Sequence, residues 1–150
     1  MIFLATGIQA TATTKTALTF ISTANIRPRL LSFNVSTDGV PTSDQSLTFQ
    51  LRRFTADGTG TAYTYGNTDP SDSAVTPLLT SKQAYSVEPT YASGFLMAPG
   101  VNPRNTWKWW PETPDAEIIL PATASNGIGW QQTAVGGSAG NLIINAACRQ

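Results

Sequence analysis

Proline and glycine recur so often along this 150-residue chain that few stretches are long enough for a helix of ordinary length. The segments between the 10 Pro and 12 Gly residues are rich in Thr, Val, Ile, Phe, Tyr and Trp, which favour strands. Many short strands in a chain of one-domain length indicate a sandwich or a barrel. The sequence therefore predicts an all-β fold, a sandwich or a barrel, in a single domain over residues 1–150.

The expected strands are apolar or alternating segments bounded by turn residues. They are residues 2–9, 15–23, 29–37, 46–54, 83–88, 94–98, 106–110, 116–120, 127–132 and 141–147. Residues 55–82 show no sustained alternation, so we expect a long loop there, with a single helical turn over 70–74. The apolar segment 1–12 stands apart from the main strand pattern and is a candidate arm for contact with another subunit or a partner protein.

The strands expected at 29–37 and 46–54 alternate most clearly. Their apolar positions are Leu31, Phe33 and Val35 in the first strand and Leu47, Phe49 and Leu51 in the second. The turn-forming residues 38–44 connect the two strands, so we expect an antiparallel hairpin in which Phe33 lies opposite Phe49.

The same register places Arg29 opposite Arg53 at the end of an otherwise apolar face. Like charges directly opposite each other destabilise a sheet, so both guanidinium groups need acceptors unless a bulge lets them reach water. The acceptors belong to a neighbouring subunit or another partner protein, which we favour, or they are internal, with Glu88, Glu112, Asp115 and Glu117 available. The residues assigned to partner binding on this ground are Arg27, Arg29, Arg52 and Arg53.

Residues 107–110 contain three of the four tryptophans. On a strand, Trp107 and Trp109 point to one face while Lys108 and Trp110 point to the other, so at least one large ring lies outside the core of the domain. The outward ring stacks on a sugar or anchors a protein interface, or else all three rings pack within the monomer. We assign Trp107, Trp109 and Trp110 as further partner-binding residues.

The charge and the residue inventory exclude several functions. Nine basic residues balance nine acidic ones, which removes the excess of positive charge that a nucleic-acid partner requires. The chain has no histidine and so lacks the usual general base and zinc ligand, and we expect no enzymatic activity, catalytic residue, metal or cofactor. No apolar run has the length of a membrane span, and residues 1–8 lack the basic start of a signal peptide.

Three features resemble chemical motifs but have structural explanations. Residues 136–140 match the G-x-S-x-G pattern, but no histidine can take the Ser138 proton and a strand is expected directly afterwards, so we expect a hairpin turn. The acidic residues of 112–117 predict a solvated turn rather than a glycosidase pair. Cys148 is the only cysteine, so it can form no internal disulfide, and without a neighbouring histidine it is not a plausible nucleophile.

Several stretches of the sequence resemble a family of small uncharacterised proteins encoded in tailed-phage genomes. The stretches are residues 17–39, 51–62 (LRRFTADGTGTA), 87–91 (VEPTY) and 119–129 (ILPATASNGIG), and the resemblance covers about residues 15–145. It implies a virion structural role. Among small all-β virion proteins the nearest analogues are capsid decoration (cement) proteins, which often have β-sandwich or jelly-roll-like cores and sit as symmetric oligomers on the capsid lattice. With this resemblance, the expected fold is an antiparallel β-sandwich of jelly-roll-like type.

The resemblance implies binding to the outside of a phage head, which would stabilise the shell because a ligand that prefers the assembled state shifts the equilibrium toward it. The expected partners are the major capsid protein and further copies of this chain in a homotrimer, and neither nucleic acid nor a membrane is expected. The expected location is the virion head surface, after synthesis in the host cytoplasm. The alternative is a carbohydrate- or receptor-binding module of a phage fibre or tail, with the tryptophans of 107–110 as stacking platforms.

Overall fold

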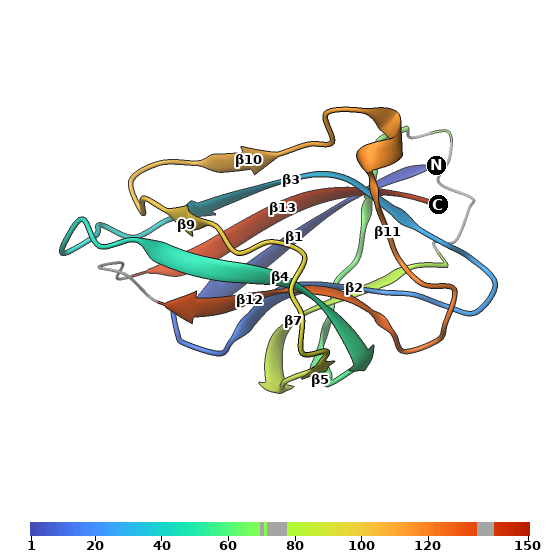
Figure 1. Ribbon diagram of the computed structural model, residues 1–150, viewed down its shortest axis with the longest axis horizontal. Coiled ribbons are helices and arrows are strands. Elements are labelled where there is room, and N and C mark those ends of the chain that lie inside the picture. The colour runs from blue at the N-terminus through green and yellow to red at the C-terminus, as the bar shows by residue number, and fades with distance from the viewer. Residues whose placement is uncertain (70, 72–77, 135–139) are drawn as a thin grey trace.

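Two antiparallel β-sheets pack against each other in the computed structural model, which describes residues 1–69, 71, 78–134 and 140–150 (Figure 1). Besides strands and turns, the described residues include a short 3₁₀ helix at Pro114–Ala116. The predicted all-β sandwich is therefore confirmed.

Among the described residues, sheet A has six strands and sheet B has seven. The order in sheet A is β10 (Trp107–Trp109), β3 (Arg29–Thr37), β13 (Asn141–Arg149), β1 (Ile2–Ala10) and β6 (Gly66–Asn67), and β11 (Ile118–Ile119) also pairs with β3. The order in sheet B is β5 (Thr59–Ala62), β7 (Thr80–Val87), β2 (Thr16–Ile21), β12 (Gly127–Ala134), β4 (Leu47–Ala56) and β8 (Thr90–Tyr91), and β9 (Gly100–Val101) also pairs with β4.

The strand pairs are nested along the chain. β1 pairs with β13, β2 with β12, β3 with β10 and β4 with β8, all of them antiparallel. Each of the first four strands therefore pairs with a later strand, and the partners come in reverse order along the chain. The nesting brings the two termini together, and the Met1 amino group donates a hydrogen bond to the Gln150 carbonyl oxygen at 3.4 Å.

Most of the expected strands are present. The strand predicted at 29–37 has the bounds of β3, and the others that match differ by a few residues. The strand expected at 94–98 is wrong, because only Met97 forms an isolated bridge there, with Leu51. The pattern did not predict β5, β6, β8 and β9, which at two to four residues are too short to show alternation.

The hairpin predicted for 29–37 and 46–54 is wrong, because the two strands belong to different sheets. β3 pairs with β13 and β10, whereas β4 pairs with β12. Their apolar faces meet across the core instead, where the Phe33 and Phe49 rings lie 6.2 Å apart, edge to face. Alternation identifies the apolar face of a strand but not its neighbour, and the connection after β3 is long enough to cross between the sheets.

Large side chains from both sheets form the core. They include Trp130, Phe20, Phe49, Leu18, Leu30, Leu47, Leu51, Leu79, Leu120 and Ile128, all fully buried. In β3, the pairing with β13 shifts between Ala147 and Cys148, and this bulge turns Leu30 inward in place of Leu31. The predicted run of inward residues is therefore broken at Leu31, which is only half-buried.

Sheet B curls because β4 and β7 each bend and continue as a further strand. β5 follows β4 after two residues, and β8 follows β7 after two residues. The two bent strands pair with each other, with Ala56 opposite Thr90 and Thr59 opposite Val87. In addition, β4 pairs with β12, β12 with β2, and β2 with β7. The paired strands of sheet B therefore form a closed ring. The bends approach so closely that a Cβ atom at Gly58 would overlap with the Val87 carbonyl oxygen.

The segment 1–12 is not a separate arm, and residues 55–82 are not a single loop. β1 lies between β13 and β6 within sheet A and buries Phe3 and Ala5. Its outward residues are also mostly apolar, which weakens the alternation that would have placed it in the sheet. Residues 55–82 contain β5, β6 and the start of β7. The helical turn expected over 70–74 lies outside the described residues.

Candidate binding face

The side of sheet A that points away from sheet B is the strongest candidate for a binding surface. In β1, β13 and β3, buried side chains face sheet B, so most of the residues that alternate with them face outward. We call this surface the outer face of sheet A.

Four polar residues form a row across the outer face of sheet A. Thr6 lies opposite Asn145, Asn145 lies opposite Asn34, and Asn34 lies opposite Lys108. The row therefore crosses β1, β13, β3 and β10 at one level of the ladder. We call these four residues the polar row.

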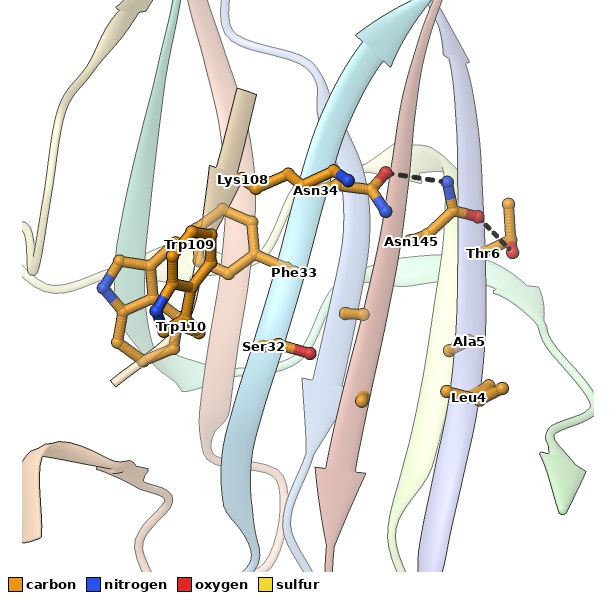
Figure 2. A pocket seen from close by; sticks show the side chains of 12 residues that line it. Leu4, Ala5, Thr6, Ser32, Phe33, Asn34, Lys108, Trp109, Trp110 and Asn145 are labelled. Carbon is orange, nitrogen blue, oxygen red and sulfur yellow. Dashed lines mark hydrogen bonds between the residues drawn. The ribbon is translucent and has the colours of Figure 1, made fainter. Parts of the chain in front are cut away.

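Hydrogen bonds within the polar row all run toward β3 (Figure 2). The Thr6 hydroxyl donates to Asn145 Oδ1 at 2.8 Å, and Asn145 Nδ2 donates to Asn34 Oδ1 at 3.0 Å. The amide nitrogen of Asn34 and the ammonium group of Lys108 make no hydrogen bond or ion pair with any residue that the structure describes. The β10 end of the row therefore presents hydrogen-bond donors without acceptors.

A hollow of about 410 Å³ lies beside the polar row. Its floor includes the next row of outward side chains, which is low because Ala147 and Ser32 are small. Leu4 stands on one side of the hollow and Trp110 on the other (Figure 2). The volume falls in the range of small-molecule sites, roughly 300–1,000 Å³.

The three predicted tryptophans lie at two levels of burial. Trp107 and Trp109 pair with inward-facing residues of β3 and are half-buried. The Trp107 ring lies 5.6 Å from Phe33 and 5.8 Å from Phe49, and the Trp109 ring lies 5.5 Å from Phe33. Trp110 is 63% exposed. The prediction that at least one of the three rings lies outside the core is confirmed, since Trp110 is outward while Trp107 and Trp109 lie on the core side, and partner binding by these residues stays a prediction.

Apolar side chains also project from β1 on the outer face of sheet A. Ile2 is 37% exposed, and Leu4 and Ile8 are each 48% exposed. Ile8 lies opposite Ile143 of β13, on the side of the polar row away from the hollow. Since the inward residues of β1 are buried in the core, this strand is apolar on both faces.

The prediction that Arg29 lies opposite Arg53 is wrong, since Arg29 lies opposite Arg149. Glu117 accepts hydrogen bonds from both of these arginines, at 3.1 Å from Arg29 and at 2.9 and 3.0 Å from Arg149. Arg53 donates to the Ile119 carbonyl oxygen at 3.0 Å. The acceptors of Arg29 and Arg53 are thus internal, which corrects the preference for acceptors on a partner, and Glu117 was one of the internal candidates.

The other two predicted arginines differ in their surroundings. Arg52 donates to Gln131 Oε1 at 2.9 Å and to the Ala92 carbonyl oxygen at 2.6 Å, and its guanidinium carbon lies 5.0 Å from the centre of the Tyr91 ring. Arg27 is exposed and has no partner in the part of the chain that the structure describes. Binding of another protein by any of the four arginines stays a prediction, and among the four only Arg27 makes no hydrogen bond or ion pair with the described residues.

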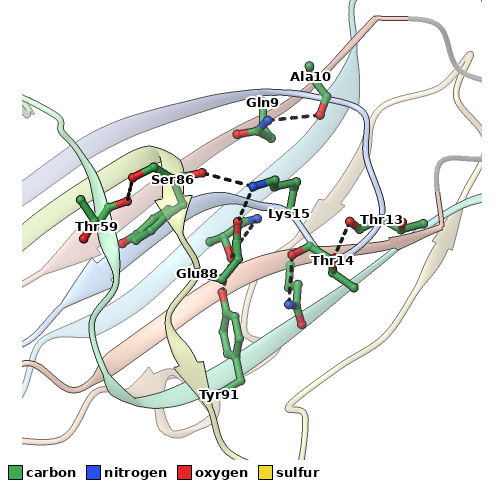
Figure 3. Close-up of polar contacts among 12 residues, drawn as sticks. Gln9, Ala10, Thr13, Thr14, Lys15, Thr59, Ser86, Glu88 and Tyr91 are labelled. Carbon is green, nitrogen blue, oxygen red and sulfur yellow. Dashed lines mark hydrogen bonds and ion pairs between the residues drawn. The ribbon is translucent and has the colours of Figure 1, made fainter.

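A second group of polar side chains joins strands of the closed ring in sheet B (Figure 3). The backbone N–H of Thr16 donates to Glu88 at 3.0 Å, and the Lys15 ammonium group lies 3.4 Å from the other Glu88 oxygen. The Thr16 hydroxyl also lies 2.8 Å from the Tyr91 hydroxyl. Burial raises the pKa of the Tyr91 hydroxyl above its usual value. These contacts tie β2 to the bend between β7 and β8.

Reasoning from sequence missed the polar row. Polar residues at outward strand positions are ordinary, so Asn34 attracts no notice on its own. A signal was present in β1, where Thr6 is the polar exception among the outward residues Ile2, Leu4 and Ile8. To predict that Thr6, Asn145 and Asn34 lie side by side, one must know the register of three strands that are far apart in sequence. The alternation of apolar and polar residues does not give this register.

The described residues include no group of three or more His, Cys, Asp or Glu that could hold a metal ion, and no helix among them is long and apolar enough to span a membrane. Burial in the core raises the pKa of the Cys148 thiol to about 12. Ser138 and its G-x-S-x-G pattern, except for Gly140, lie outside the described residues.

No protein-family model, curated protein or solved structure matches the chain. The outer face of sheet A is therefore the main guide to function. It presents hydrogen-bond donors, an exposed indole ring and apolar side chains, and this combination suits binding.

Proposed function

We propose that the chain is a non-enzymatic structural protein of a phage virion, a decoration protein that binds the outside of the head and stabilises the shell. Its proposed partners are the major capsid protein and further copies of this chain in a homotrimer. The observation that carries the proposal is the outward apolar side of β1, where Ile2, Leu4 and Ile8 are 37% to 48% exposed. Burial against a partner removes these side chains from water, which favours assembly.

The nested strand pairs support a jelly-roll-like core for this role. When one long antiparallel ribbon is rolled into two sheets, its first strand pairs with its last and its second with its second to last, as β1 with β13 and β2 with β12 do here. Double-sheet folds of this kind occur in viral capsid domains and in lectins. The core is thus suited to a virion protein and to a sugar-binding protein.

A density map of the virion whose genome encodes this chain tests the proposal. We expect the sandwich on the outside of the head, with Ile8 and its neighbours buried against the shell or another copy. A map that places the sandwich only in the tail would contradict the decoration role. A virion without the sandwich would contradict any structural role.

A pair of matched variants tests the contact surface. Ile8→Thr keeps a β-branched residue in β1 but removes apolar area, and it should weaken binding to isolated heads at least about fivefold. Val40→Thr makes the same kind of change at a position that is 82% exposed in the connection between β3 and β4, and binding should not change. Equal effects of the two variants would show that the outer face of sheet A is not the contact.

A carbohydrate- or receptor-binding role in a phage fibre or tail is the second candidate function. The hollow beside the polar row favours it, because a sugar needs an aromatic surface for its ring and polar groups for its hydroxyls. Trp110 supplies the exposed ring, whereas Trp107 and Trp109 pack against Phe33. Trp110→Ala should abolish sugar binding without affecting the Ile8 contact, so the two candidate functions are separable.

A further inference from the structure

We propose that the hollow on the outer face of sheet A binds an acidic saccharide, with the carboxylate at the Lys108 end of the polar row and the sugar ring against Trp110. The inference rests on the second candidate function and names its class of ligand. It assigns separate tasks to two groups, charge recognition to Lys108 and ring recognition to Trp110.

The negative charge of the proposed ligand is inferred from two hydrogen-bond donors that lack acceptors. The Lys108 ammonium group and the Asn34 amide nitrogen lie at the same end of the polar row, and the described part of the chain supplies no acceptor to either. A carboxylate accepts hydrogen bonds from both groups and also neutralises the positive charge of Lys108. A hydroxyl accepts hydrogen bonds but leaves that charge in place. Glu112 shares a smaller hollow of about 180 Å³ with Lys108 but forms no ion pair with it.

The polar row fixes the direction of the Asn34 amide. Because Asn34 Oδ1 already accepts from Asn145, whose own oxygen accepts from Thr6, the Asn34 amide nitrogen is the group left for a ligand. A donor held in place by its neighbours loses little conformational freedom on binding. Thr6 and Asn145 are therefore positioning residues for Asn34.

The shape of the hollow suits a ring lying on its face. Ala147 and Ser32 leave room above the sheet, and Leu4 limits the hollow on the side opposite Trp110. The Trp109 ring lies nearly parallel to the Phe33 ring, at 30° and 5.5 Å, so that pair is already packed. Trp110 is the ring that a ligand can cover.

A glycan array tests the proposal on the full chain. The array should carry neutral glycans together with glycans that contain uronic acids or sialic acids. We expect binding to acidic glycans, and we expect their binding to weaken as salt is raised. The best acidic glycan and its carboxyl-methyl ester then form a matched pair for calorimetry, and the ester should bind at least about tenfold more weakly because it has lost the charge.

Four variants locate the site. Trp110→Ala and Lys108→Gln should each weaken binding of the acidic glycan at least about tenfold. Arg104→Gln removes another exposed cation, whose side chain is 57% exposed, and Phe95→Ala another exposed aromatic ring, 58% exposed, and both should bind as the unchanged chain does. Equal thermal unfolding of all four variants shows that any loss is not a loss of fold.

The possible results have different consequences. Binding of neutral glycans that is lost in Trp110→Ala but kept in Lys108→Gln would overturn the acidic ligand and leave the second candidate function intact. Binding of acidic glycans that survives both substitutions would place the site elsewhere. No binding to any glycan would overturn both the inference and the carbohydrate-binding form of the second candidate function, without bearing on attachment to the head.

Discussion

Glu117 is the residue on which two arginines of sheet A depend. Its side chain is 8% exposed and pairs with Arg29 and Arg149, which lie opposite each other on β3 and β13. Without this carboxylate, two positive charges would face each other directly across a ladder, an arrangement that destabilises a sheet. The carboxylate comes from the residue that directly follows the 3₁₀ helix at Pro114–Ala116.

Glu117→Gln should therefore lower the free energy of unfolding by about 1–2 kcal/mol, because two charge-assisted hydrogen-bonded pairs are weakened while the like charges remain. The arginine side chains are 45% and 47% exposed, so water limits the loss. Urea unfolding measures the effect. Adding Arg149→Gln to Glu117→Gln should recover part of the stability, and a double variant that is no more stable than Glu117→Gln would contradict the repulsion.

Asp38 links stability to acid pH. The backbone N–H and the side-chain amide of Asn141 donate to it at 2.7 and 2.9 Å and hold the pKa of the carboxyl below its ordinary value of 3.8. The contact therefore stabilises the fold above pH 3.8, and the stabilisation is lost as the pH falls through the lower pKa of the folded state. An NMR titration should find the Asp38 midpoint below 3.8. Asn141→Ala should raise that midpoint only in part, because the backbone N–H remains, and an unchanged midpoint would rule out the side-chain contribution.

At the scale of single elements, β10 joins the core to the binding face. Its two half-buried tryptophans extend the aromatic cluster around Phe33, and Lys108 between them faces outward in the polar row. Trp110 follows directly after the strand ends and stays in solvent. One short strand thus positions core residues and ligand-facing residues by simple alternation.

Trp107→Ala should lower the free energy of unfolding by about 2–4 kcal/mol, because the ring contacts Phe33 and Phe49 and its removal leaves a cavity. Trp110→Ala should change it by no more than about 0.5 kcal/mol, as is usual for surface positions. Thermal or denaturant unfolding distinguishes the two. A loss at Trp110 as large as that at Trp107 would place the Trp110 ring in the core and remove it from the binding face.

The positions of the long strands could be predicted from sequence, but their partners could not. The pattern of apolar positions identifies β3 and β4 because each buries one face, yet two strands that face each other across a core show the same pattern as two strands side by side. The bulge at Leu31 adds an error that alternation cannot detect. In the candidate site, strand geometry predicted that Trp110 lies on the opposite face from Trp107 and Trp109, but not which face points outward. The row through Asn34 and Asn145 depends on register.

At the scale of the whole molecule, the outer face of sheet A leaves Leu4 and Ile8 of one strand in contact with water. A neutral chain has no net charge to hold copies apart. Association through the outer face of sheet A is the expected result.

Light scattering should therefore give a mass three times the 15.9 kDa of one chain at micromolar concentration. Ile8→Thr should shift the population toward the monomer, because it removes apolar area from the interface, while Val40→Thr should not. A mass of 15.9 kDa for the unchanged chain would contradict the homotrimer.

The nested order of the strands has a consequence for synthesis on the ribosome. β13 is translated after every other strand that the structure describes, and it lies between β1 and β3 in the finished sheet A. Until residues 141–149 leave the exit tunnel, β1 and β3 lack their shared neighbour and expose unpaired edges. Sheet A can therefore close only after β13 has been made, and a chain that stops before β13 would be a substrate for chaperones and proteases rather than a shorter working protein.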